Sequence, residues 1–125
     1  LGGILVNLAL QSCENHLLLV VRSRARNLEP KSIGYVNAHA TATKHGDIAE
    51  SIATNELFCN KIAISSLKSY LGHTLGACGA LEAWFTIEMM NSGWFAPTVN
   101  LNDIDPRCGK VDYILSGGRE IETDY

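Results

Sequence analysis

Two histidines of the sequence each follow a short apolar segment with the composition of a buried strand. His39 comes directly after residues 33–38, and His73 ends the loop that follows residues 61–65. Side chains that follow neighbouring parallel strands meet at one edge of the sheet. A single histidine near a strand end is more often structural, but two neutral imidazoles aimed at one point stabilise a developing oxyanion. The pair therefore predicts a site for an anionic oxygen formed during a reaction.

The same two loops carry other polar groups. Thr41 and Thr43 lie in the first loop, where local backbone hydrogen bonds are the simpler interpretation for threonines in a turn. Lys68 lies in the second loop, where most lysines are solvated. We expect Lys68 instead to hold the second loop through a partly buried ion network. The acidic members of this network are Asp47, Glu50 and Glu82.

Helix and strand signals alternate along the chain. They predict helices at 14 to about 27, 48–58 and 75 to about 91, and strands at 33–38, 61–65 and 110–115, whereas residues 1–11 fit a strand or a helix. Asp47 is expected to cap the second helix with Glu50 as its capping-box partner, and Gly93 to stop the third. The order predicts parallel strands joined by crossover helices, an α/β layered sheet.

Composition restricts the class of protein. The 125 residues carry 10 Lys plus Arg and 13 Asp plus Glu, a net charge of −3, and 46% of them are hydrophobic. This predicts one soluble globular domain and argues against nucleic acid as a partner. No apolar run has the roughly 20 residues that a membrane helix needs. The chain also begins without an initiator methionine, so we expect a piece of a longer protein.

The cysteines predict a reducing compartment. None of the four forms a CxxC pair, which excludes a zinc ribbon, and each has apolar or small neighbours. We therefore expect buried, reduced thiols and a cytoplasmic protein.

Three motifs in order resemble the β-ketoacyl-acyl carrier protein synthases. They are YVNAHATAT at 35–43, GDIAE at 46–50 and KSYLGHTLGA at 68–77, and the segments 79–83 and 96–101 continue the likeness. The resemblance is clear over about 33–113. It implies the C-terminal half of a thiolase-like layered fold, α/β with a mostly parallel sheet and crossover helices. Residues 1–125 are then a single, truncated C-terminal β-ketoacyl synthase domain.

The resemblance also implies a chemistry. Such enzymes of fatty acid biosynthesis decarboxylate malonyl-carrier protein and join the carbanion to an acyl thioester, a decarboxylative Claisen condensation. It assigns to His39 and His73 the hydrogen bonds to the thioester enolate, and to Lys68 a supporting catalytic role without proton transfer. Thr41 and Thr43 match threonines that bind the phosphopantetheine arm.

The implied partners follow from the same likeness. They are an acyl carrier protein with a phosphopantetheine-linked malonyl or acyl group and a second copy of the full-length chain, with no cofactor. No metal is expected, although His39, His45 and Asp47 are a conceivable ligand set.

The sequence departs from the family pattern in several places. Ala40 and Ala42 stand where Gly and Ser are more usual, and a left-handed backbone at Ala40 would be strained. Nothing matches the turn that carries the nucleophilic cysteine, and Cys78 is interpreted as a core residue. Two alternatives stay open: a ketosynthase-like domain of a polyketide assembly line, and a non-catalytic structural fragment. The apolar helix around Trp84 and Phe85 is expected to leave a surface that an absent partner covers.

Overall fold

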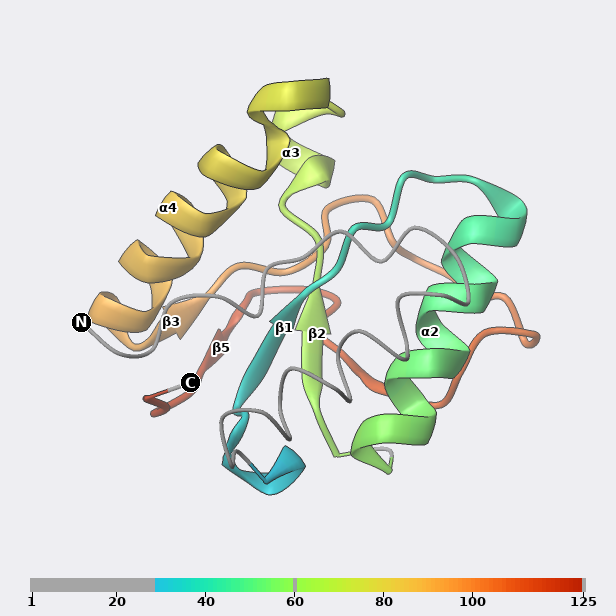
Figure 1. Ribbon diagram of the computed structural model, residues 1–125, viewed down its shortest axis with the longest axis horizontal. Helices are drawn as coiled ribbons and strands as arrows, with labels where there is room; N and C mark the ends of the chain where they lie inside the picture. Colours follow the sequence, from blue (N-terminus) through green and yellow to red (C-terminus); the bar gives the residue numbers. More distant parts are fainter. Residues whose placement is uncertain (1–28, 60, 125) are drawn as a thin grey trace.

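The computed structural model describes residues 29–59 and 61–124 (Figure 1). The predicted helix at 14–27 and the segment 1–11 lie outside the described residues. In chain order the elements are η1 (Pro30–Ser32), β1 (Tyr35–Asn37), α2 (Lys44–Phe58), β2 (Ala63–Ser65), α3 (Lys68–Leu71), η2 (Leu75–Ala77), α4 (Cys78–Ser92), β3 (Trp94–Phe95), β4 (Asp112–Tyr113) and β5 (Arg119–Glu120).

The central sheet is parallel, with strand order β1-β2-β4. Its two faces pack against different helices because successive strand residues point to opposite sides. Val36 and Ile64 join one apolar cluster with Phe58 of α2, whereas Tyr35 and Ala63 join a second cluster with Met89 of α4. In Figure 1, α2 and α4 flank the strands on opposite sides. The predicted α/β layered sheet with parallel strands and crossover helices is therefore confirmed.

The predicted start of α2 is wrong. The helix begins at Lys44 with Thr43 as its N-cap residue, and no side chain caps it. Asp47 therefore lies inside the first turn, and Glu50 does not complete a capping box. The Glu50 carboxylate instead accepts two backbone N–H groups of the loop before the helix, from His39 and Ala40.

Two regions have more structure than the sequence indicates. The loop after β2 contains α3 and η2, and a two-stranded antiparallel ribbon pairs β3 with β5. Strands of two residues are too short for an alternating pattern to be visible in the sequence. The predicted end of α4 is confirmed, since Gly93 adopts φ 70 directly after Ser92.

The cysteine prediction holds in part. Within the described residues Cys59, Cys78 and Cys108 are free, and Cys78 is buried as expected. Cys59 is exposed because it is the left-handed residue that follows α2, with φ 53. Cys13 lies outside the described residues.

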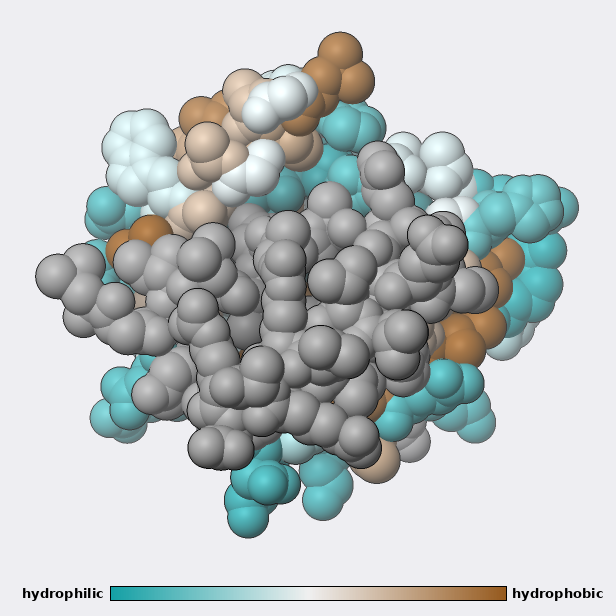
Figure 2. Space-filling view, viewed as in Figure 1, coloured by the Kyte–Doolittle hydropathy of each residue, from teal (hydrophilic) through white to brown (hydrophobic). Residues whose placement is uncertain are grey.

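The helix α4, which is expected to leave an apolar surface, exposes apolar side chains over part of its length. Trp84 is 58% exposed and Leu75, just before α4, is 77% exposed, whereas Met89 is buried. Figure 2 shows hydrophobic side chains at the end of the molecule where α4 begins. None of the helices within 29–59 and 61–124 is long and apolar enough to cross a membrane.

Candidate active site

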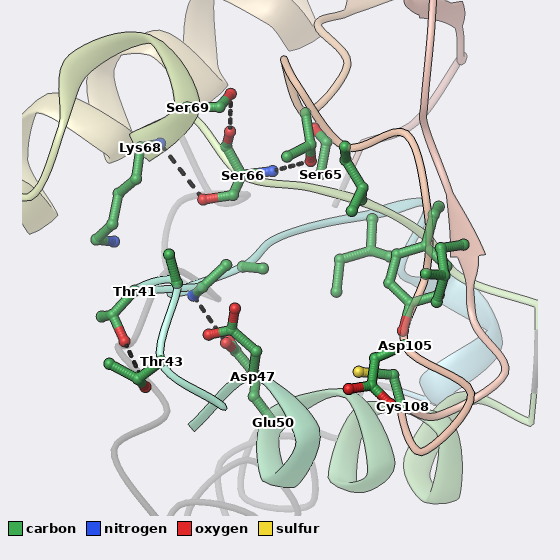
Figure 3. A pocket seen from close by; sticks show the side chains of 18 of the residues that line it. Thr41, Thr43, Asp47, Glu50, Ser65, Ser66, Lys68, Ser69, Asp105 and Cys108 are labelled. Atoms are coloured by element: carbon green, nitrogen blue, oxygen red, sulfur yellow. Dashed lines mark hydrogen bonds between the residues drawn. The ribbon is translucent and has the colours of Figure 1, made fainter. Parts of the chain in front are cut away.

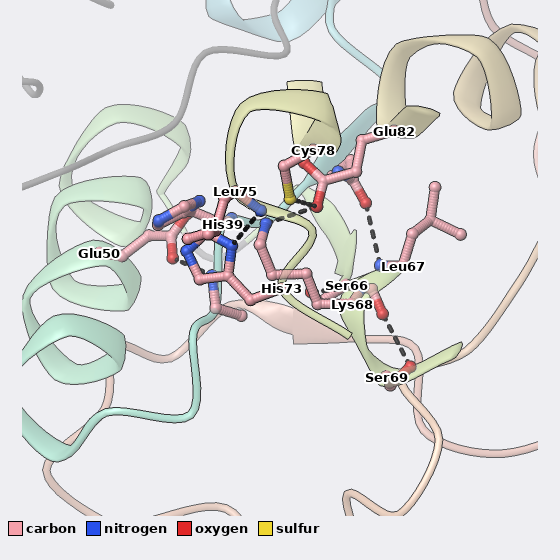
Figure 4. A network of polar contacts seen from close by, with 12 residues as sticks. His39, Glu50, Ser66, Leu67, Lys68, Ser69, His73, Leu75, Cys78 and Glu82 are labelled. Carbon is pink, nitrogen blue, oxygen red and sulfur yellow. Dashed lines mark hydrogen bonds and ion pairs between the residues drawn. The ribbon is translucent and has the colours of Figure 1, made fainter. Parts of the chain in front are cut away.

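The carboxyl ends of β1 and β2 bring the two histidines together. The Ala38 N–H donates to the Ser65 carbonyl oxygen at 2.8 Å, which extends the pairing of the two strands up to the residue before His39. After β2 the chain forms α3 and turns at Gly72, with φ 70, into His73. The imidazole centroids of His39 and His73 lie 5.3 Å apart with the rings at 87° (Figure 4). The two rings therefore contact each other edge-to-face at this edge of the sheet.

The contacts of the rings bear on their protonation. The Leu75 N–H donates to Nδ1 of His73 at 3.3 Å, which places the proton of the neutral ring on Nε2. Burial lowers the pKa of His39 below its ordinary value of 6.5, and the nearby Lys68 and His73 lower it further. His39 is therefore neutral at pH 7, so a hydrogen bond from it adds no full charge.

A buried ion pair lies behind the histidines. The Lys68 ammonium contacts the Glu82 carboxylate, and both side chains are 5% exposed. The Cys78 thiol donates to the same carboxylate oxygen at 3.3 Å. The pair connects α3 to α4 on either side of His73 (Figure 4).

Of the four predicted members of the ion network, Lys68 and Glu82 contact each other directly among the described residues, whereas Asp47 and Glu50 lie beside the His39 loop. Glu50 accepts the backbone N–H groups of His39 at 2.7 Å and Ala40 at 2.8 Å. Asp47 holds one buried carboxylate oxygen that has no hydrogen-bond partner among the described residues. Burial raises the pKa of both carboxyls. Glu50 thus holds the backbone of the His39 loop, Asp47 lies against residues 41–43 of the same loop, and Lys68 pairs with Glu82.

The His39 loop has an unusual backbone. Ala40 has φ 33 and Ala42 has φ 59, both in the left-handed region that L-residues with a side chain adopt at a cost. The two hydrogen bonds to Glu50 hold the loop at Ala40. The strain expected at Ala40 is therefore present.

A cavity of about 980 Å³ opens beside the site (Figure 3). Both loops line it, with Thr41, Thr43, Lys68 and His73 among the lining residues, whereas His39 is not among them. The Thr41 and Thr43 hydroxyls lie 3.0 Å apart and hydrogen-bond to each other. The cavity is therefore lined by hydroxyl groups and by one imidazole, that of His73.

No role in the site was predicted from the sequence for the segment 96–101, but residues 98–101 line the cavity. Thr98 accepts the Ser66 N–H at 2.9 Å, and Ser69 accepts the Val99 N–H at 3.0 Å. Serines directly after a predicted strand were the available signal. Within the described ranges, no group of three or more His, Cys, Asp or Glu side chains could hold a metal ion.

The parallel sheet, its crossover helices and the paired loop histidines define a thiolase-like α/β protein of the ketosynthase type. Residues 16–102 match the family model of the beta-ketoacyl synthase C-terminal domain, and the chain belongs to this family.

Relatives and solved structures agree with this assignment. The chain is 44% identical over 92 residues to the chloroplastic 3-oxoacyl-[acyl-carrier-protein] synthase I of Hordeum vulgare, which covers 72% of this chain and 19% of that protein. A beta-ketoacyl synthase from Burkholderia phymatum STM815 superposes with a TM-score of 0.84 at 52% identity, covering 86% of this chain and 26% of that one. A type II polyketide ketosynthase in complex with its acyl-carrier protein gives 0.79 at 29% identity, covering 85% and 26%. The chain thus spans about a fifth to a quarter of the proteins it matches.

Proposed function

We propose that residues 1–125 form a single C-terminal β-ketoacyl synthase domain that supplies the enolate-stabilising part of a 3-oxoacyl-[acyl-carrier-protein] synthase of fatty acid biosynthesis. The observation that carries the proposal is the edge-to-face pair of His39 and His73 at 5.3 Å beside a cavity. The parent protein is then an acyltransferase.

The proposed reaction begins with malonyl-carrier protein. The bond between the carboxylate and the α-carbon breaks, CO2 leaves, and the electron pair passes into the thioester as an enolate. His39 and His73 donate hydrogen bonds to the enolate oxygen, and the buried Lys68–Glu82 pair keeps the His73 loop in place. The α-carbon then attacks an acyl thioester on a cysteine that the rest of the parent protein supplies, and the cysteine thiolate leaves. Losing one such hydrogen-bond donor typically costs about 2.7–4 kcal/mol of barrier.

The proposed partner is an acyl carrier protein. Thr41 and Thr43 line the cavity and offer hydroxyls to the amide groups of the phosphopantetheine arm. A related ketosynthase occurs in complex with its acyl-carrier protein, which supports the same type of partner here. We further propose a homodimer for the full-length protein and a cytoplasmic location, in keeping with the free cysteines of the described part.

A polyketide ketosynthase is the second candidate. Structural neighbours from polyketide systems favour it, among them the carrier-protein complex at 29% identity. The decarboxylation chemistry is the same in both, so the acyl primer that the parent accepts distinguishes them.

The experiment uses the full-length parent. His73→Ala should slow malonyl-carrier decarboxylation more than about tenfold, which corresponds to about 1.4 kcal/mol. His45→Ala is the matched control, because His45 is exposed and lies outside the cavity lining. A folded His73→Ala protein with the wild-type rate would contradict the proposal.

The isolated chain provides a second test. It should form no covalent acyl adduct when incubated with a radiolabelled acyl-carrier substrate, because no residue matches the nucleophile. Stoichiometric labelling of Cys78 would contradict this assignment.

A further inference from the structure

Asn37 is a buried amide at the junction of the two histidine loops. It is the last residue of β1, stands two positions before His39, and is 7% exposed. Its Oδ1 atom accepts the backbone N–H of Leu67 at 3.2 Å, so the bond joins the end of β1 to the segment between β2 and α3. A side chain at the end of β1 thus accepts a hydrogen bond directly from the backbone of the loop that carries His73.

Leu67 is the residue from which α3 starts. Its carbonyl oxygen accepts the N–H groups of Tyr70 at 3.0 Å and Leu71 at 3.2 Å, so the position of Leu67 sets the position of the short helix. Lys68 is the first residue of α3, and His73 follows its end. Fixing Leu67 to Asn37 therefore fixes Lys68 and His73 relative to β1.

The orientation of the Asn37 amide is determined by this contact. The Leu67 N–H is a donor, so it requires Oδ1 rather than Nδ2 on the facing side. Nδ2 is consequently turned away, and it is buried with no hydrogen-bond partner among the described residues. Burying an unpaired amide donor is unfavourable. The bond from Leu67 to Oδ1 is the compensating contact that the structure shows.

We infer that Asn37 is a positioning residue, which sets the separation between His39 on one loop and Lys68 and His73 on the other. The inference rests on the proposed function of the two histidines. Asn37 does not line the cavity, so it acts through α3 and does not touch the substrate.

The inference has a consequence for the protonation of His39. Lys68 of α3, His73 of the second loop, Glu82 of α4 and Asp47 of α2 act on the His39 ring, and Glu50 of α2 accepts the His39 backbone N–H. Lys68 and His73 lower its pKa, whereas Glu82 and Asp47 raise it. If α3 and the loop after it move away, burial, which is the largest cause of the lowered pKa, decreases together with the effects of Lys68 and His73, and the pKa of His39 rises. The acid limb of the decarboxylation rate, where His39 becomes protonated, then moves to higher pH.

The test compares Asn37→Leu with the wild type in the full-length protein, with Asn91→Leu as a control on the exposed end of α4. Asn37→Leu deletes the acceptor while keeping a similar side-chain volume. For Asn37→Leu we expect kcat for malonyl-carrier decarboxylation to fall about ten- to hundredfold with KM within about twofold, since small misplacement of catalytic groups has effects of this size. Its acid limb should move to higher pH, and hydrogen exchange should accelerate at 67–71. Asn91→Leu should retain the wild-type rate, acid limb and protection.

Each outcome decides one hypothesis. A folded Asn37→Leu protein with wild-type kcat and acid limb overturns the inference. If Asn37→Leu does not fold, Asn37→Ala deletes the same acceptor without a branched side chain, and the same readouts apply. A normal rate in His73→Ala defeats the proposed function, whereas a slow His73→Ala beside a normal Asn37→Leu defeats only the positioning role.

Discussion

The Lys68 ammonium and the Glu82 carboxylate form an ion pair in which each side chain is only 5% exposed. The pair joins α3 to α4, so the His73 loop between them is held at both ends. Removing one partner of such a pair leaves a buried charge without compensation, whereas replacing both partners by apolar residues is often tolerated.

A double-mutant cycle on this pair should therefore be strongly non-additive. Lys68→Met alone is expected to lower the free energy of unfolding by about 3–5 kcal/mol, because Glu82 stays buried and unpaired. Lys68→Met combined with Glu82→Leu should recover most of this loss. Urea unfolding of the wild type, of each single variant and of the double variant measures the coupling free energy. If the losses of unfolding free energy in the two single variants simply add in the double variant, the two side chains have no coupling energy.

The Glu50 carboxyl should make stability depend on pH. Burial raises its pKa above the ordinary 4.5, with the Ala40 and His39 N–H groups opposing the shift. The folded state then binds the proton more tightly, so the contribution of Glu50 is greatest below pH 4.5 and declines as pH rises through the folded pKa. Glu50→Gln removes this titration. Denaturant titrations should show that the free energy of unfolding of the wild type, relative to that of Glu50→Gln, decreases from pH 4.5 upward. A difference that stays constant or increases would contradict the raised pKa of Glu50.

The left-handed backbone at Ala40 predicts a stabilising substitution. In the left-handed region, the folded conformation of a residue with a side chain is about 1–2 kcal/mol less favourable than that of glycine. Glycine also makes the unfolded chain more flexible, which lowers the free energy of unfolding by about 0.4–1 kcal/mol. Ala40→Gly should therefore raise the free energy of unfolding by about 0.5–1 kcal/mol. Ala49→Gly, inside α2, is the matched control and should lower it by about 1 kcal/mol. Equal losses in both variants would mean that Ala40 is not strained.

The exposed apolar residues at the start of α4 should make the isolated chain self-associate. Leu75 is 77% exposed, and the Trp84 ring stacks on Phe85 with centroids 5.4 Å apart on the outer side of the helix. Sedimentation with a hydrophobic dye should show oligomers and dye binding, and Leu75→Lys with Trp84→Lys should reduce both. Leu115→Lys alters an exposed leucine elsewhere and should have little effect. A monodisperse wild-type monomer that binds no dye would contradict this expectation.

The sequence by itself determined the elements that depend on local pattern. The apolar segments before His39 and Ser66 have the composition of buried strands, and β1 and β2 form there in parallel register. The end of α4 at Gly93 follows from the conformational freedom of glycine. Parallel strands bring the loops that carry the two histidines to one edge of the sheet, whereas α3 and the turn at Gly72 complete the approach of His73 to His39.

Only the tertiary structure decided which polar groups pair over long distances. Glu50 looked like a capping residue because its spacing from Asp47 fits that role, but it bonds to the backbone of His39 and Ala40 instead. The acceptor for the Leu67 N–H is Asn37, 30 positions earlier in the chain.

The Gly109 N–H likewise donates to Ser51, which is 58 positions away. The local sequence pattern indicates which residues are buried and whether a segment is a helix or a strand. The hydrogen-bond partners of these N–H groups depend instead on which backbone groups stay unpaired once the layers have packed. Each buried N–H must find an acceptor wherever packing has placed one.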